Sequence, residues 1–203
     1  MLRPHQPGDM GWIIHRHGVL YAEEYGFDES FEAMVARIVA TFLENFDPRR
    51  ERCWIAERDG EVVGSVLLVK DSEKTAKLRL LYVEPKARAL GIGSRLVSEC
   101  IGFARRAGYR KITLWTNDVL VSARRIYQPA GFSLVEEEQH HSFGQDLVGQ
   151  YWQLALPARD TAHSDAAGDF SAIREVTWTL DRGKPNATAI PRLCRRLWQR
   201  RPV

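Results

Sequence analysis

The feature that most constrains the fold is a strand, a tight turn and a helix that follow one another in the middle of the chain. Residues 78–83 are apolar with one interruption, which predicts a buried strand, and Pro85 ends it because proline cannot donate to a neighbouring strand. From Ile92 onward the apolar residues have helical spacing. Gly91 and Gly93 leave the first N–H groups of this helix approachable, at the positive end of the helix dipole. The segment therefore predicts a site for an anion, most naturally a phosphate.

The glycine pattern departs from the two common phosphate-binding fingerprints. A dinucleotide-binding turn needs a third glycine where this chain has Leu96, and a Walker turn needs Gly-Lys-Ser/Thr where it has Gly93-Ser94-Arg95. Residues 88–93, Arg-Ala-Leu-Gly-Ile-Gly, instead resemble the pyrophosphate-binding signature of the GNAT superfamily of acetyl-CoA-dependent N-acyltransferases, Arg/Gln-x-x-Gly-x-Gly/Ala. The alternative is a glycine-rich turn that serves close packing only.

The composition is that of an ordinary globular protein, with 44% hydrophobic and 27% charged residues in a chain of 203. The sequence has no apolar run long enough to cross a membrane, and its start lacks the apolar segment of a secretion signal, so we expect a cytoplasmic protein. The net charge of +3 comes from the last part of the chain: residues 1–156 carry 20 Lys and Arg against 21 Asp and Glu, and residues 157–203 carry 9 against 5. The main domain therefore gives no charge argument for binding DNA.

The remaining pattern predicts helices and strands in a definite order. Asp59-Gly60 between two apolar runs is typical of a tight hairpin, and Asp28 is placed to cap the most regular helix. Residues 131–156 have the spacing of a long hairpin around a loop of polar residues, 137–146. The order predicts an α/β three-layer sandwich around a mixed, mostly antiparallel sheet of six to seven strands, with helices on both faces. The expected helices are residues 9–25, 29–46, 92–107 and 118–127, and the expected strands are residues 1–3, 52–57, 61–69, 76–83, 111–116, 132–136 and 148–156.

This order resembles that of the GNAT fold over residues 1–156, which we expect to form one domain. Asn117 after a strand, the segment from Ser122 to Tyr127 and the pair Gly131-Phe132 resemble the closing segment of the family. The opening residues 8–18 resemble the GNAT modules that follow a MarR-type winged helix in some bacterial proteins, which suggests a bacterial source. No winged helix precedes them here, so DNA binding by that route is not expected.

The resemblance implies a binding site for acetyl-CoA as the acetyl donor, without a metal. Main-chain groups of the strand would face the pantetheine arm, and the turn amides would bind the pyrophosphate, with Arg88 adding charge or bracing the turn. None of the histidines has the spacing of a metal site. The implied cofactor-binding residues are Leu81, Tyr82, Val83, Arg88, Ala89, Leu90, Gly91, Ile92, Gly93, Ser94, Asn117 and Ser122.

Transfer of an acetyl group to an amine requires two proton movements. A lysine-like amine has a pKa near 10.4, so keeping it neutral at pH 7 costs about 3.4 pKa units, or roughly 4.6 kcal/mol. The leaving coenzyme A thiolate then needs a proton, which a tyrosine can supply. Tyr127, which matches the family's tyrosine, is the candidate acid, and the alternative is that it only packs on its helix.

The base is not identified by the sequence. Many family members carry a glutamate on the strand about ten residues before the arginine of the turn, where this chain has Lys77, Leu78 and Arg79. Glu23 and Glu24 lie where the family builds its acceptor pocket, and they are candidates to attract a cationic amine and pass its proton through water. The alternative for both is a solvated helix face.

We expect an acetyl-CoA-dependent N-acetyltransferase that works by direct attack of a primary amine of a small molecule or a peptide. The alternative is a non-catalytic acyl-CoA-binding regulatory or interaction module, which the missing strand carboxylate favours. The residues do not identify the acceptor, and a homodimer stays an open alternative.

Residues 157–203 are expected to form a linker and a basic C-terminal extension. A helix after Pro191 would place arginines on one side and apolar residues on the other, and such a helix can bind a partner, an anionic membrane surface or nucleic acid. A disordered extension, or a helix docked on its own domain, is the alternative. The three cysteines are odd in number and far apart, so we expect Cys53 and Cys100 to pack as small apolar residues rather than to form disulfides.

Overall fold

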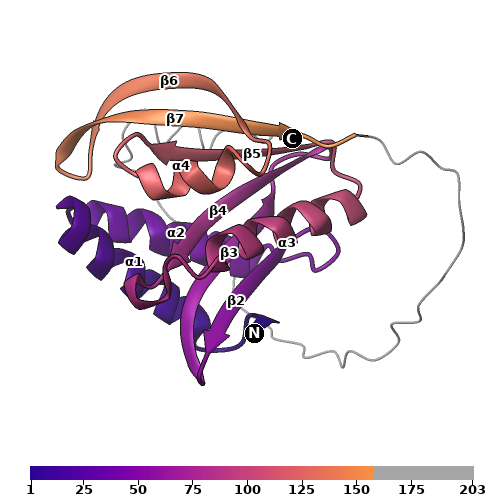
Figure 1. Cartoon of the computed structure of the whole chain (residues 1–203), viewed down its shortest axis with the longest axis horizontal. Coiled ribbons are helices and arrows are strands. Elements are labelled where there is room, and N and C mark those ends of the chain that lie inside the picture. The colour runs from indigo at the N-terminus through magenta and orange to yellow at the C-terminus, as the bar shows by residue number, and fades with distance from the viewer. Residues whose placement is uncertain (158–203) are drawn as a thin grey trace, which may run out of the picture. The chain divides into compact units, whose positions relative to one another are not determined.

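A seven-stranded sheet forms the centre of the computed structural model, which describes residues 1–157 (Figure 1). The strand order is β1-β2-β3-β4-β5-β7-β6, and every neighbouring pair is antiparallel except β4 and β5, which are parallel. The mixed, mostly antiparallel sheet predicted from the sequence is therefore confirmed. The strands are β1 (Leu2–Pro4), β2 (Arg52–Arg58), β3 (Glu61–Lys70), β4 (Thr75–Val83), β5 (Lys111–Asn117), β6 (Ser133–Ser142) and β7 (Gln145–Ala155).

Helices cover both faces of this sheet, as the sequence predicted. The helices α1 (Asp9–Tyr25) and α2 (Glu29–Glu44) pack on one face, and α3 (Ile92–Arg106) and α4 (Val121–Tyr127) pack on the other. A short 3-10 turn, η1 (Pro85–Ala87), joins β4 to the segment before α3. The predicted linker and C-terminal extension lie outside the described residues from position 158 onward.

The local sequence of α2 determines where this helix begins and which of its sides is buried. The Asp28 carboxylate accepts a hydrogen bond from the backbone N–H of Ser30 at 3.0 Å and so caps the helix, as predicted. Its buried residues follow at helical spacing and face the sheet, which stabilises the helix by removing one apolar stripe from water. These buried residues are Phe31, Val35, Val39 and Phe42.

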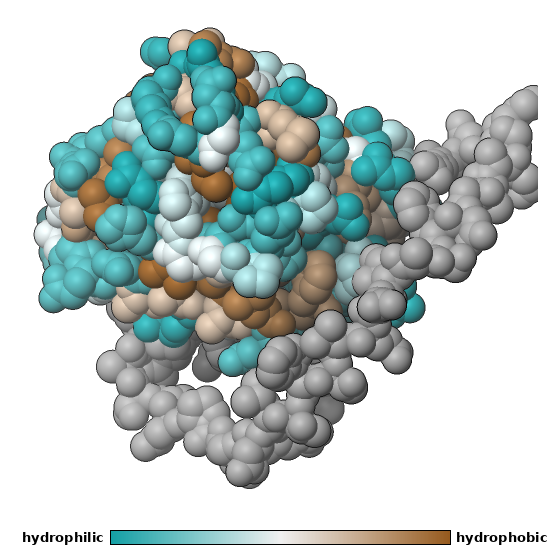
Figure 2. Space-filling view, turned by 90° about the horizontal axis from the view of Figure 1, so that it is seen from below, coloured by the Kyte–Doolittle hydropathy of each residue, from teal (hydrophilic) through white to brown (hydrophobic). Residues whose placement is uncertain are grey.

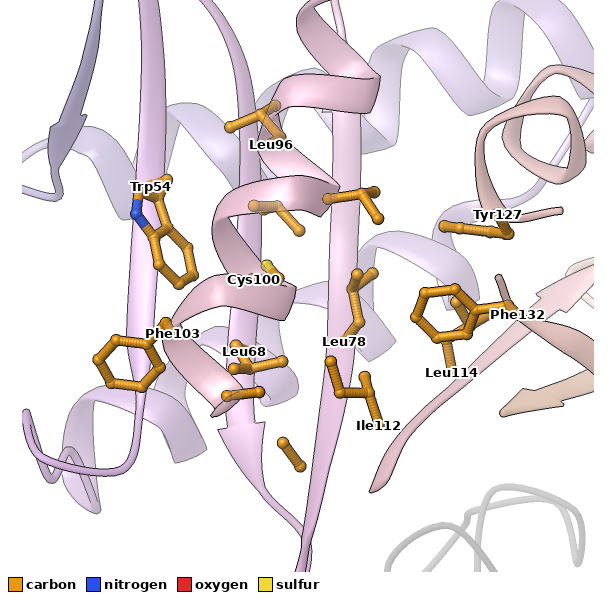
Figure 3. Packing of buried hydrophobic residues seen from close by; sticks show 14 of the residues in the cluster. Trp54, Leu68, Leu78, Leu96, Cys100, Phe103, Ile112, Leu114, Tyr127 and Phe132 are labelled. Atoms are coloured by element: carbon orange, nitrogen blue, oxygen red, sulfur yellow. The ribbon is translucent and has the colours of Figure 1, made fainter. Parts of the chain in front are cut away.

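Two hydrophobic clusters fill the spaces between the sheet and its two helical layers. Figure 3 shows the cluster beneath α3, where Leu96 and Cys100 lie over strand residues such as Leu68 and Leu78, and the Phe103 ring lies beside Trp54 of β2. Outside these cores, polar residues cover most of the face in Figure 2, with apolar residues in smaller patches between them. Cys53 and Cys100 are buried free thiols, which confirms their expected role as small apolar residues.

The parallel pair β4–β5 is short, and this positions the candidate site. Only Thr75–Lys77 pair with Lys111–Thr113, and beyond that point the two strands diverge. The register of β4 against β3 also shifts before Tyr82, where Leu80 has a positive φ of 51° that is typical of a bulge. The last residues of β4 therefore have no strand partner on the side of β5, and their main-chain groups are available to a ligand.

The last hairpin differs from the sequence-based expectation. The long hairpin predicted for residues 131–156 is confirmed, but the polar residues 137–146 were expected to form its loop, whereas β6 continues to Ser142 and β7 begins at Gln145. The turn consists of Phe143 and Gly144, with φ values of 59° and 76°. The prediction was wrong because β6 is an edge strand, which tolerates charged side chains, and because Phe-Gly lacks the Asn or Asp that usually marks such a turn. The Asp59-Gly60 hairpin is confirmed, with φ values of 53° and 80°.

Two glycine substitutions, one at a crowded position in β3 and one at a less crowded position in α3, test the packing around these elements. A Cβ on Gly64 would lie 2.8 Å from the Tyr82 carbonyl oxygen, a backbone atom that cannot move aside, so Gly64→Ala should lower the free energy of unfolding by about 1–3 kcal/mol. A Cβ on Gly102 in α3 would meet only the flexible end of Arg106, at 3.3 Å, so Gly102→Ala should stabilise the helix by up to about 1 kcal/mol. Urea denaturation of both variants measures these changes, and effects of the same sign would contradict this account of the packing.

Candidate active site

A cavity with a volume of about 480 Å³ lies at the C-terminal end of β4. Its walls come from the last turns of α1, the end of β4, the turn before α3, and α4. The chain thus brings together segments that are up to about a hundred residues apart in sequence. The cavity is lined by Leu20, Tyr21, Glu24, Tyr25, Leu81, Tyr82, Val83, Ala87, Arg88, Ala89, Gly91, Ile92, Gly93, Ser94, Leu120, Ser122, Ala123, Arg125 and Ile126.

The turn before α3 has the geometry of an anion site. Ala89 and Gly91 have positive φ values of 62° and 74°, and no side chain caps the start of the helix. A Cβ on Gly91 would meet no atom within 4 Å, so the turn borders open space, whereas a Cβ on Gly93 would lie 2.6 Å from Ile126 Cδ1 in α4. The first N–H groups of α3 thus lack a side-chain acceptor at the positive end of the helix dipole. These features fit a bound phosphate group.

Arg88 of this turn pairs across the cavity with Glu24 at the end of α1. The Arg88 Nη2 lies 2.8 Å from Oε1 and 3.0 Å from Oε2 of Glu24, and Arg88 Nε donates to the Val83 carbonyl at 3.4 Å. The Glu24 carboxylate, a candidate to attract an amine, is therefore bound to a cation in this structure. No local sequence pattern indicates this pair, because its members lie 64 positions apart.

A second ion pair attaches α1 to the end of β4. Arg16 donates from Nε and Nη2 to the two oxygens of Glu84, at 2.6 and 2.9 Å, and the Glu84 side chain is only 10% exposed. The two-pronged geometry is the strong form of an Arg–carboxylate pair. Glu84 therefore holds the strand end in place directly before the turn.

The structure brings most of the predicted cofactor residues into the cavity wall. Those that line it are Leu81, Tyr82, Val83, Arg88, Ala89, Gly91, Ile92, Gly93, Ser94 and Ser122.

Four predicted residues do not line the cavity. Leu90 is 53% exposed and belongs to the turn only through its backbone, and Glu23 is exposed to solvent. The Asn117 side chain is buried at the end of β5, where its Oδ1 lies 3.0 Å from Nε2 of His140 on β6. The fourth is Tyr127.

Tyr127 is 5% exposed in the core beneath α3 and packs on Phe132, with ring centroids 5.8 Å apart (Figure 3). Burial raises the pKa of its hydroxyl above the usual value of 10.0. The side chain is therefore protonated at neutral pH, as a proton donor must be, but it is also a packing residue.

A buried polar group next to the cavity was not predicted from the sequence. His17 in α1 is 1% exposed, and its Nδ1 donates to the Ile13 carbonyl at 2.8 Å, which leaves Nε2 buried without a partner. Its ring lies 5.1 Å from that of Tyr82 and 5.7 Å from that of Tyr21, both of which line the cavity. Burial lowers the pKa of His17 to about 4, so the imidazole is neutral at pH 7. Nothing in the sequence distinguished this position from a core histidine.

Within residues 1–157, no group of three or more His, Cys, Asp and Glu side chains could hold a metal ion. No helix in that part of the chain is both long enough and apolar enough to cross a membrane.

Comparisons with known proteins agree with this geometry. The profile of the Acetyltransferase (GNAT) family matches residues 17–132. An uncharacterized N-acetyltransferase of Schizosaccharomyces pombe is 27% identical over 122 residues, which cover 60% of this chain and 75% of that protein. Human N-acetyltransferase 8B is 37% identical over 112 residues, which cover 52% of this chain and only 49% of the human protein.

Solved structures share the fold at low sequence identity. A Salmonella typhimurium protein solved with its cofactor acetyl-CoA aligns with a TM-score of 0.64 at 18% sequence identity. The alignment covers 82% of this chain and 98% of the Salmonella chain. The ribosomal-protein-alanine N-acetyltransferase of Brucella melitensis aligns with a TM-score of 0.64 at 20% identity, over 77% of this chain and 99% of its own.

The chain belongs to the GNAT acetyltransferase family, because the family profile spans more than half of it and the fold agrees. The sequence relatives named above are eukaryotic, so they do not support the bacterial source that the opening residues suggested.

The buried histidine generates a pH-dependent prediction. Its pKa is 6.5 when unfolded and about 4 when folded, so between these values the unfolded chain binds a proton that the folded chain does not. The free energy of unfolding should therefore decrease as the pH falls from 6.5 to 4, with His17 contributing up to about 3 kcal/mol of that loss. His17→Gln should remove this part of the slope, and the exposed control His15→Gln should retain it. Urea denaturation between pH 7 and 4.5 compares the slopes, and parallel curves for His17→Gln and the parent would contradict the assignment.

Proposed function

We propose that this protein transfers an acetyl group from acetyl-CoA to a primary amine by direct attack. The observation that carries the proposal is the uncapped, glycine-rich start of α3, which lines a cavity beside the unpaired end of β4. The Salmonella structure that holds acetyl-CoA supports the choice of donor, since its fold is shared over most of the described chain.

In this proposal the chain binds the donor mainly through its backbone. The amides of residues 90–94 and the Arg88 side chain would hold the pyrophosphate. Main-chain groups of Leu81 to Val83 on the side of β4 that has no strand partner would hold the pantetheine arm. The bound donor supplies the activated acetyl group. Ser122 on α4 lines the opposite wall of the cavity.

The chemistry requires the amine nitrogen to bond to the acetyl carbon while the carbon–sulfur bond breaks. The amine must first lose a proton, which costs about 4.6 kcal/mol at pH 7 for a lysine-like group, and water is the proposed acceptor of that proton. The leaving sulfur gains a proton, for which Tyr127 is the proposed donor. Direct transfer is favoured over an acetyl-enzyme because the cysteines within residues 1–157, Cys53 and Cys100, are buried and do not line the cavity, and burial raises the pKa of both thiols.

The first test is titration calorimetry with acetyl-CoA. Gly91→Glu places a carboxylate where the pyrophosphate would lie and should weaken binding at least tenfold through like-charge repulsion. Gly91→Ala has the same backbone strain at positive φ without the charge, so it should retain most of the affinity. No binding by the parent protein, or equal losses in the two variants, would overturn the proposal.

A second candidate function is a non-catalytic acyl-CoA-binding module. It is favoured by the absence of a carboxylate at positions 77–79 of β4 and by the position of Tyr127 outside the cavity lining.

Tyr127→Phe separates the two functions. If Tyr127 is the acid, the variant should lose turnover at least tenfold while its dissociation constant for acetyl-CoA stays within about twofold. Tyr109→Phe removes another buried tyrosine hydroxyl far from the cavity and is the matched control. A screen of primary amines with acetyl-CoA measures turnover, and its complete absence in the parent favours the binding module.

A further inference from the structure

The ion pair between Glu24 and Arg88 joins two walls of the cavity. Glu24 belongs to the last turn of α1, and Arg88 belongs to the turn that starts α3; their side chains are 26% and 40% exposed. Arg88 uses one nitrogen for both carboxylate oxygens, at 2.8 and 3.0 Å. The arginine of the proposed pyrophosphate site therefore has an anionic partner within the protein.

An anion in the turn would compete with Glu24 for this guanidinium. A pyrophosphate carries more negative charge than a carboxylate and is also attracted by the N–H groups of α3, which Glu24 does not contact. Arg88 would then pair with the phosphate, and Glu24 would be left without its cation. The Glu24 carboxylate, whose side chain is 26% exposed, would then attract another cation.

The charges around the cavity point to the nature of that replacement. Among the described residues that line the cavity, Glu24 is the one acidic side chain, and Arg88 and Arg125 are the basic ones. Burial and the Glu24 carboxylate raise the pKa of the Tyr25 hydroxyl, while Arg88 acts in the opposite direction, so the charges of both members of the pair act on this residue of the cavity wall. A cationic group that enters the cavity therefore has a single carboxylate to bind.

We propose that Glu24 exchanges cations: it pairs with Arg88 in the free protein and binds the ammonium group of the acceptor once the donor's pyrophosphate has taken Arg88. Glu24 is thus a specificity-determining residue for protonated primary amines, and its site becomes available only when the donor is bound. The inference rests on the proposed acetyltransferase function.

The first experiment measures the competition without any acceptor. Glu24→Gln removes the competing carboxylate, so calorimetry should show acetyl-CoA binding that is about 3–10 times tighter than in the parent. Glu44→Gln, at the exposed end of α2, makes the same change in net charge and should leave the affinity unchanged. Unchanged or weaker binding by Glu24→Gln overturns the exchange.

The second experiment measures the released carboxylate with n-butylammonium as the probe. Saturation-transfer NMR should detect this probe on the parent protein saturated with coenzyme A, at least fivefold more strongly than on the free protein. The signal should disappear in Glu24→Gln and persist in Glu44→Gln. A signal that is independent of coenzyme A, that depends on Glu23 instead, or that is absent in every state overturns the proposal.

The experiments distinguish a failure of the proposed acetyltransferase function from a failure of the cation exchange at Glu24. If the parent protein does not bind acetyl-CoA, the proposed function fails. If the parent binds acetyl-CoA but Glu24→Gln changes neither the affinity for acetyl-CoA nor the n-butylammonium signal, the proposed function stands and only the cation exchange fails.

Discussion

The divergence of β4 from β5 is the constraint on which the candidate site depends. The two strands share a parallel register over three residues of each, and beyond it the end of β4 has a neighbour only in β3. A strand edge left unpaired in the interior would be costly, because buried N–H and C=O groups need partners. The cavity at this position supplies the space in which a ligand can satisfy them, and the glycine turn follows directly in the chain.

Helix α1 holds this open arrangement in place. Its Arg16 binds Glu84 at the strand end, its Glu24 binds Arg88 in the turn, and its buried face packs on the sheet. The hydrophobic clusters on the two faces keep β3 and β4 fixed while β4 separates from β5. In the proposed function, the backbone would therefore provide most of the contacts to the donor, and the side chains of α1 would set the charge around it.

The sequence predicted those features that depend on neighbouring residues. The strand, turn and helix around Gly91, the Asp28 cap and the Asp59-Gly60 hairpin all follow from local conformational preferences, and all are present. The order of the elements and the family resemblance also predicted the sheet with helices on both faces, but individual contacts between distant residues were not predicted. The pairing of Glu24 with Arg88 and the burial of His17 beside Tyr82 arise only when α1 folds onto β4, and the Phe143-Gly144 turn is determined by pairing between strands.

The most direct test of this account is a backbone NMR titration of the parent protein with acetyl-CoA. The account predicts that the largest changes in amide chemical shift occur at Leu81 and Val83 on the free end of β4 and at residues 89–94 of the turn. Changes concentrated on another surface, or none at saturating acetyl-CoA, would contradict the claim that the divergent strands and the helix start form the donor site.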